Sequence, residues 1–343
     1  MPLKLGPHNI DFPYILAPMA GITNAPFRRL MREVGAGLAV SELISATGLQ
    51  YGGRKTLELC QYFEEERPVG LQIFGEDADH LSQAARQLET RGVDFVDINL
   101  GCPVPKVVGK GAGAAMLKDP MVLYKTLAQV RASIQIPLTI KIRTGWDACS
   151  INASECVHAA AEAKVTWVAI HGRTRAQGYE GSADWDLIAR VKEKSPLPII
   201  GNGDILTAEH AVQRLRESGC DAVMIGRGAL RDPFLFLQIS ELTGAGRGRV
   251  EDWTYWKLIS RHVELLKQCF SDFYVGVQLR KFLTWYSAGI EGASNFRKLL
   301  YEQPATERGT EAVIELGRQF FDRPGIAKQT SFLKEPFLKG GHG

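Results

Sequence analysis

Short apolar runs rich in β-branched residues recur along residues 14–228, and each has the length of a strand. They are YILAPM (from residue 14), LAVSEL (38), VGLQIFG (69), FVDINLG (95), PLTIKIRTG (137), WVAIHGRT (167), LPIIGNGDI (197) and DAVMIGRG (221). Helix-period segments such as DADHLSQAARQLETRG separate most of them. Strands that alternate with helices pair in parallel, and eight such units in about 230 residues match a (β/α)8 TIM barrel. A doubly wound open sheet is the alternative, but no G-x-G-x-x-G follows the first strand.

The pattern changes after residue 243. GAGRGR (244–249) has the composition of a linker, and WTYWKLISRHVELLKQCF and GVQLRKFLTWYSAGI beyond it have helical periodicity without strand runs. We therefore predict a TIM-barrel domain over residues 1–243, a small all-helical domain over 250–325 and a frayed tail over 326–343.

The composition is that of an ordinary globular enzyme, with 45% apolar and 23% charged residues. No segment reads as a signal peptide, and no apolar run is long enough to cross a membrane. The six cysteines are irregularly spaced and form no C-x-x-C, which argues against a disulfide framework and a zinc site. We expect a cytoplasmic protein without a metal.

The net charge of +3 is unevenly distributed. Residues 244–343 hold 15 Lys and Arg against 11 Asp and Glu, whereas residues 1–243 hold 26 against 27. A solvated helical face would explain this excess, and so would a surface that binds a polyanion.

Polar residues stand at the C-terminal ends of the predicted strands, where TIM barrels carry their chemistry. Among them Lys141 lies between Ile140 and Ile142, so strand alternation points it towards the barrel mouth, where a cation suits an anionic group. The amides of Gln72 and Asn99 can both donate and accept hydrogen bonds, as reading a flavin or uracil edge requires. His171 fits either a site residue or a structural histidine.

Two glycine-containing turns close the last two strands, GNGD (201–204) and GRGAL (226–230). Glycines there let backbone N–H groups approach an anion, and this corner of the fold is a common phosphate site. Two ordinary turns are the alternative.

Taken together, APMAGITNAPFR, LQIFG, DINLGCPVPKV, GAGAAML, KIRTGW, HGRTRAQGY, IGNGDI and GRGAL resemble the tRNA-dihydrouridine synthases, most closely the bacterial B-type enzymes. The likeness extends to RKFLTWYSAG and NFRKLL in the helical region. It implies an FMN-containing barrel that uses NADPH to reduce the C5=C6 bond of uridines in tRNA, in the D-loop. Separately, we expect the protein to be a monomer.

The resemblance also implies residue roles. The positions expected to bind the cofactor are Pro18, Met19, Ala20, Gln72, Lys141, His171, Asn202, Gly203, Asp204, Gly226 and Arg227. Those expected to contact the substrate are Asn99, Arg143 and Arg173, and Cys102 matches the catalytic cysteine.

Cys102 follows a predicted strand, between Gly101 and Pro103. A free thiol has a pKa of about 8.5, so near neutral pH it can donate a proton. In the implied reaction, hydride passes from N5 of reduced FMN to C6 of uracil, and Cys102 protonates C5. Two other functions remain open, a flavin-dependent oxidoreductase of a free pyrimidine, like dihydroorotate dehydrogenase, and a non-catalytic tRNA-binding protein.

Overall fold

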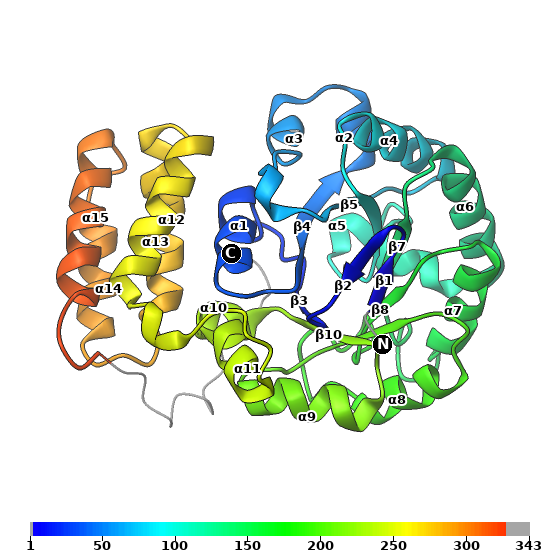
Figure 1. Ribbon diagram of the computed structural model, residues 1–343. Coiled ribbons are helices and arrows are strands. Elements are labelled where there is room, and N and C mark those ends of the chain that lie inside the picture. Colours follow the sequence, from blue (N-terminus) through cyan, green and yellow to red (C-terminus); the bar gives the residue numbers. More distant parts are fainter. Residues whose placement is uncertain (1–2, 327–343) are drawn as a thin grey trace.

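The computed structural model describes residues 3–326 and shows all eight predicted strands (Figure 1). They form a closed parallel barrel in the order β10-β3-β4-β5-β6-β7-β8-β9. Their bounds are β3 Tyr14–Leu16, β4 Leu38–Ser45, β5 Val69–Phe74, β6 Phe95–Leu100, β7 Leu138–Arg143, β8 Val168–His171, β9 Ile199–Asn202 and β10 Ala222–Ile225. Because β10 also pairs with β3, the open sheet is excluded and the TIM barrel is confirmed.

Helices surround the barrel, and side chains at their N-termini explain where several begin. Four helices, α4 (Ala78–Thr90), α6 (Pro120–Ser133), α8 (Trp185–Lys194) and α9 (Ala208–Ser218), follow a residue whose side chain accepts a hydrogen bond from a backbone N–H group in the first turn. These residues are Asp77, Asp119, Asp184 and Thr207. The helices between the strands are α1 Ala25–Glu33, α2 Ala46–Gln50, α3 Arg54–Glu58, η1 Glu64–Glu66, α4 Ala78–Thr90, α5 Pro105–Val108, η2 Gly113–Lys118, α6 Pro120–Ser133, α7 Ala153–Glu162, α8 Trp185–Lys194 and α9 Ala208–Ser218. Then α10 Arg227–Arg231 and α11 Leu235–Thr243 follow the last strand.

The N-terminal end of the barrel is filled with apolar side chains. Phe95 and Trp167 pack edge to face with ring centroids 5.8 Å apart, and a Cβ on Gly70 would lie 1.9 Å from the Phe95 ring. A hairpin of β1 (Leu3–Leu5) and β2 (His8–Ile10), which the strand pattern did not predict, lies across this end. Leu3, Leu5 and Ile10 join the same buried cluster as Phe95, so the hairpin closes the barrel floor.

Strand register gathers the polar residues at the other end of the barrel. Asn99 on β6 is paired with Lys141 on β7. Arg143 on β7 is paired with His171 on β8, which is in turn paired with Asn202 on β9. Side chains that are far apart in the sequence therefore line one mouth.

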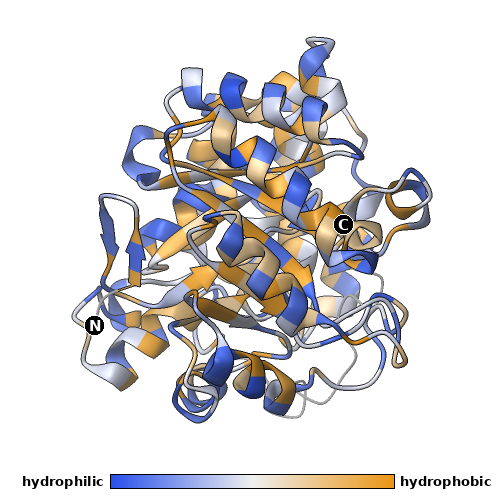
Figure 2. Ribbon diagram, turned by 90° about the vertical axis from the view of Figure 1, so that its right-hand side faces the viewer, coloured by the Kyte–Doolittle hydropathy of each residue, from blue (hydrophilic) through white to orange (hydrophobic). Residues whose placement is uncertain are grey.

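Beyond the barrel, η3 (Val250–Asp252) precedes the helices α12 (Tyr255–Cys269), α13 (Asp272–Tyr286), α14 (Ala293–Glu302) and α15 (Glu307–Phe321), which lie beside α1 (Figure 1). Phe27 of α1 packs against His262 and Phe282, so the hydrophobic core continues from the barrel into these helices. Figure 2 shows hydrophobic residues on the strands and hydrophilic residues on the outer helix faces. The predicted helical region is present, whereas the division at residues 243 and 250 into separate domains stays a prediction. Apart from residue 326, the predicted tail lies outside the described residues.

Candidate active site

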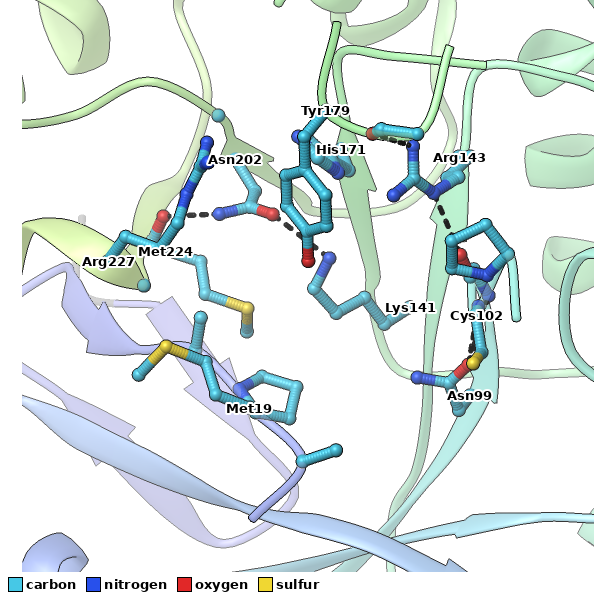
Figure 3. A pocket seen from close by; sticks show the side chains of 18 of the residues that line it. Met19, Asn99, Cys102, Lys141, Arg143, His171, Tyr179, Asn202, Met224 and Arg227 are labelled. Carbon is cyan, nitrogen blue, oxygen red and sulfur yellow. Dashed lines mark hydrogen bonds between the residues drawn. The ribbon is translucent and has the colours of Figure 1, made fainter. Parts of the chain in front are cut away.

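A cavity of about 1070 Å³ opens at the C-terminal ends of the barrel strands. This volume reaches the upper end of the range of about 300–1,000 Å³ for ligand pockets, so more than one small group can enter it. In Figure 3, Asn202 and Arg227 lie on one side, Cys102 lies on the other, and Lys141 lies between them. Every predicted site residue except Arg173 lines the cavity: Pro18, Met19, Ala20, Gln72, Asn99, Cys102, Lys141, Arg143, His171, Asn202, Gly203, Asp204, Gly226 and Arg227.

The Cys102 loop follows β6 and is held by the side-chain amide of Asn99. Oδ1 of Asn99 accepts hydrogen bonds from the backbone N–H groups of Gly101 (3.2 Å) and Cys102 (2.8 Å). Its Nδ2 donates to Oε1 of Gln72 at 2.8 Å. Asn99 is predicted to contact the substrate, but this loop already occupies its carbonyl oxygen, which leaves one amide hydrogen for a ligand.

The Cys102 side chain borders the cavity, and the residue is only 7% exposed. Burial raises the pKa of its thiol above the usual value, and a backbone hydrogen bond from Val104 and the charge of Arg143 only partly oppose this effect. The thiol is therefore protonated at neutral pH and able to donate a proton.

A buried polar layer supports the site from below, and its central residue, Asp97, was not predicted. The Asp97 carboxylate accepts hydrogen bonds from Nε2 of Gln72 (2.7 Å) and Oγ1 of Thr139 (2.6 Å). Burial raises the pKa of Asp97 to about 6, against these hydrogen bonds and the charge of Lys141. Since Gln72 is bound in turn to Asn99, this layer fixes the position of the Cys102 loop.

Lys141 reaches across the barrel mouth, as strand alternation predicted. Its Nζ donates to Oδ1 of Asn202 at 3.0 Å, and Nδ2 of Asn202 donates to the backbone oxygen of Met224 at 2.7 Å. Burial, and after it the charge of the nearby Arg143, lowers the pKa of Lys141 to about 7, and the charge of Asp97 only partly opposes them. This amine can therefore be charged or neutral near neutral pH, according to what binds beside it.

His171 is a neutral ring within a group of cations. Burial first, and then the charges of Arg143 and Lys141, lower its pKa well below the usual value. Nη1 of Arg173 lies 3.3 Å from Nε2 of His171, and because a guanidinium can only donate, Nε2 is the acceptor. The proton of the neutral ring is consequently on Nδ1.

Arg143 lines the cavity but uses most of its donors to hold loops. Nε donates to the backbone oxygen of Gly101 at 2.8 Å, and Nη1 donates to those of Thr174 and Gly178, each at 2.8 Å. Burial lowers the pKa of Arg143 to about 10, so it remains a cation at neutral pH. Among the described residues, Nη2 has no hydrogen-bond partner, and it is the part of Arg143 that a substrate could engage.

Arg173 differs from the prediction of substrate contact, because it lies behind the cavity wall. Its guanidinium donates to both carboxylate oxygens of Asp204, at 2.9 and 2.8 Å, and to the backbone oxygens of Glu180 (3.1 Å) and Gly181 (2.7 Å). The residue is 2% exposed. It therefore positions Asp204 and the loop after β8, a role that a strand-end position alone does not distinguish from ligand binding.

The predicted phosphate corner brings three strand ends together. Gly203 has φ +134°, and a Cβ there would lie 2.5 Å from the Cβ of Ala183, so only glycine fits without rearrangement. Asp204 also has a positive φ of 52° and lies 3.5 Å from Nη2 of Arg227. Met19, from the loop after β3, closes the corner, since a Cβ on Gly226 would be 3.5 Å from its sulfur.

Tyr179 is a cavity residue that the sequence analysis did not single out. Cζ of Arg227 lies 4.6 Å and Cζ of Arg143 lies 5.8 Å from its ring centroid. The ring belongs to the loop after β8, and Figure 3 shows it in front of Lys141 and Asn202. The signal in the sequence was an aromatic residue between two glycines, Gly178 and Gly181, in the loop after a predicted strand. The structure shows that both glycines have positive φ.

A closed eight-stranded barrel with a buried, cation-rich cavity at the C-terminal strand ends defines a TIM-barrel enzyme. The family model described as dihydrouridine synthase (Dus) matches residues 15–322. The chain belongs to the dihydrouridine synthase family, and it is an oxidoreductase that acts on tRNA. The family predicted from the motifs is thus confirmed, and the use of a flavin is consistent with this membership.

Curated relatives match along nearly their whole length. The tRNA-dihydrouridine synthase B of Pseudomonas syringae pv. tomato is 37% identical over 94% of this chain and 95% of its own. The proteins of the same name from Xanthomonas axonopodis pv. citri and Pseudomonas aeruginosa are 36% and 35% identical, each over 93% of this chain and 96% of their own.

Solved structures with the same barrel are more distant. Histamine dehydrogenase from Rhizobium sp. 4-9 has a TM-score of 0.56 at 13% identity, over 77% of this chain and 50% of its own. A 2-naphthoyl-CoA reductase in complex with 2-naphthoyl-CoA has a TM-score of 0.55 at 16% identity, over 73% and 52%. At such low sequence identity the likeness shows the fold alone. The chain also spans only about half the length of these proteins.

Two further findings concern residues 3–326. Within this range no helix combines the length and the apolar character needed to span a bilayer. Over the same residues, no group of three or more His, Cys, Asp or Glu side chains is arranged to hold a metal ion.

Proposed function

We propose that this enzyme uses FMN, with NADPH as reductant, to convert specific D-loop uridines of tRNA to 5,6-dihydrouridine, and that Cys102 donates the proton to C5. The observation that carries this proposal is the Cys102 thiol. It borders the cavity, burial keeps it protonated, and the Asn99 amide holds its loop in place.

The residues of the cavity fit FMN. The backbone N–H groups of Arg227 and Gly228 begin α10 and therefore have no partner within that helix, and the Arg227 guanidinium lies beside them. These donors, with the glycine turn at Gly203, would hold the phosphate. Lys141 and Gln72, in the middle of the cavity, would hold the polar edge of the flavin ring.

When bound and reduced, FMN would supply the hydride for C6 of uracil. The protein supplies the remainder of the reaction. Cys102 gives a proton to C5, so that one hydride and one proton saturate the C5=C6 bond. Arg143 and Lys141, both at the same cavity, stabilise the negative charge that develops on the uracil ring before this proton arrives. The Cys102 thiolate regains its proton from solvent.

A uridine in folded tRNA must leave its stack before it can enter a cavity of this depth. We assign the binding of tRNA to the helices within 250–325, as predicted. The net charge of these helices does not explain that binding. Residues 250–325 hold ten Lys and Arg and ten Asp and Glu, because the positive excess beyond residue 243 lies in the linker and the tail. Binding by these helices therefore depends on where individual cations stand. We further propose that the enzyme is cytoplasmic and acts as a monomer.

The direct test is to incubate the purified protein with unmodified tRNA and NADPH and to map dihydrouridine by mass spectrometry. We expect one FMN per chain on denaturation, NADPH oxidation that depends on tRNA, and dihydrouridine confined to the D-loop. Reduction of free pyrimidines without reduction of tRNA would instead identify an enzyme like dihydroorotate dehydrogenase. A colourless protein that binds tRNA without changing it would identify a non-catalytic binder.

A further inference from the structure

Two cations share one indole ring at the rim of the cavity. Nζ of Lys118 lies 3.7 Å and Cζ of Arg175 lies 4.5 Å from the ring centroid of Trp146. We call these three residues the rim cluster. Its loops are tied together, because the N–H of Arg175 donates to the backbone oxygen of Gly145 and the N–H of Ala176 donates to that of Trp146, each at 2.9 Å.

No carboxylate neutralises the rim cluster within residues 3–326. Neither Lys118 nor Arg175 forms an ion pair with any residue of that range, and Nε of Arg175 is buried without a hydrogen-bond partner there. The neighbouring acids are engaged elsewhere: Asp119 accepts N–H groups in the first turn of α6, and Asp147 accepts the N–H of Cys149. Two cations held together without an anion form a site for an anionic ligand.

The rim cluster lies across the barrel mouth from the C-terminal helices. Its residues come from the loops that follow β6, β7 and β8, and in the closed barrel β7 is four strands from β3 in either direction. The helices α12–α15 lie beside α1, which follows β3, and Figure 1 shows them on the left, with α6 and α7 on the right. A ligand that touches both sides must span the whole mouth.

We propose that Lys118 and Arg175, supported by Trp146, bind backbone phosphates of tRNA that flank the nucleotide inserted into the cavity. This inference rests on the proposed function. A base that enters the cavity stays attached to its backbone, so the phosphates on either side of it remain at the mouth. Arg175 lines the cavity, whereas Lys118 is exposed outside it. The two cations therefore lie along a path that the tRNA backbone would take as it leaves the cavity. Trp146 holds the two cations through its ring face, as cation–π pairs do.

The test compares two double variants of the full-length protein that remove the same charge. Lys118→Ala/Arg175→Ala alters the rim cluster, and Lys194→Ala/Arg216→Ala alters exposed cations in the last turns of α8 and α9, at the opposite end of the barrel. The dissociation constant for unmodified tRNA is measured by fluorescence anisotropy at salt concentrations from about 50 to 200 mM. Flavin absorbance and thermal unfolding confirm that each variant is folded.

We expect the rim variant to bind tRNA at least about tenfold more weakly than the wild type, because each lost contact is a charge-assisted hydrogen bond. The slope of log K against log salt should fall by about one to two units, and the control variant should match the wild type in both measurements. The KM for tRNA should rise more than kcat falls. Trp146→Leu should weaken binding in the same way, whereas Trp146→Phe, which keeps a ring face, should restore most of the affinity.

The phosphates of NADPH are the competing source of anionic groups, so the KM for NADPH is measured with the same variants. A rise in that KM with unchanged tRNA affinity would assign the rim cluster to the reductant and overturn the proposal. Equal tRNA binding by the rim and control variants would also overturn it. A wild-type protein that forms no dihydrouridine would instead reject the proposed function itself.

Discussion

The two ends of the barrel interior are built on the same strands, yet they differ in polarity. On β6 the inward positions change from Phe95 through Asp97 to Asn99. From Trp167, which immediately precedes β8, they change through Ala169 to His171 at the end of that strand. At the N-terminal end the inward side chains form an apolar cluster that the hairpin β1–β2 closes. At the C-terminal end they form a cavity with buried polar groups.

This difference assigns stability to the N-terminal end of the barrel and function to the C-terminal end. Buried apolar groups stabilise the fold, whereas buried polar and charged groups cost free energy unless they are fully paired. The lowered pKa of Lys141 and the raised pKa of Asp97 are signs of that cost. Variants at the floor should therefore change the free energy of unfolding, and variants at the mouth should change catalysis.

The largest effect is expected at the mouth, for Cys102→Ala. General acid catalysis contributes about 10²- to 10⁴-fold, so this variant should form dihydrouridine at least about 10²-fold more slowly. It should keep its flavin, and NADPH should still reduce that flavin. Single-turnover formation of dihydrouridine, measured by mass spectrometry, tests this expectation.

Cys149→Ala is the matched control, since Cys149 is an exposed cysteine that does not line the cavity. It should react at the wild-type rate. A Cys102→Ala protein that forms dihydrouridine at full rate would exclude the thiol as the acid. One that loses its fold or its flavin would show that Cys102 has a structural role instead.

At the floor, Phe95→Ala should lower the free energy of unfolding by about 3–5 kcal/mol, because it leaves a cavity between Trp167 and Gly70. Denaturant titration of the wild type and the variant gives the difference. The rate per folded molecule should remain close to that of the wild type. If Phe95→Ala abolished catalysis without a loss of stability, the two ends would not be separable in this way.

Lys141 predicts a pH dependence. Its pKa is about 7 in the fold and 10.5 in a free side chain, so between these values the unfolded chain binds a proton that the folded chain has lost. Folding stability supplied by this position therefore rises with pH in that window, by up to about 1.4 kcal/mol per pH unit. Below pH 7 both states are protonated and the contribution is flat.

Other groups titrate in the same range, so the measurement is the difference in stability between the wild-type protein and Lys141→Met, both free of flavin. This difference should shift in favour of the wild type as the pH rises above about 7. A difference that is constant, or that moves in the other direction, would show that Lys141 keeps an ordinary pKa in the fold.

The smallest effect is expected outside the barrel, at the contact between α1 and α12. Arg261 donates to both carboxylate oxygens of Glu33, at 2.9 and 2.8 Å, but its side chain is one-third exposed. Arg261→Ala should cost about 1 kcal/mol or less, and less still at high salt. Arg318→Ala, which breaks an exposed pair within α15, should cost even less in the same denaturant titration. Equal losses would mean that the contact with Glu33 adds nothing.

Much of the site was predictable because strand alternation and strand ends are local properties. The isoleucines on either side of Lys141 were enough to place its amine in the cavity, and the position of Cys102 just after a strand placed its thiol there. Asp97 and Tyr179 were missed because their roles depend on neighbours from other strands. Asp97 is recognisable only once Gln72 and Thr139 are seen to surround it.

The sequence by itself determined the eight strands, the parallel barrel and the family, since periodicity and motif order are properties of the chain. Tertiary structure alone decided which polar side chains form hydrogen bonds that hold loops in place and which remain available to bind a ligand. Arg173 stood at a strand end like Arg143, yet it is paired with Asp204 behind the wall. The reason is physical: a side chain's donors bind whichever acceptors the fold brings within reach, and those acceptors belong to residues distant in sequence.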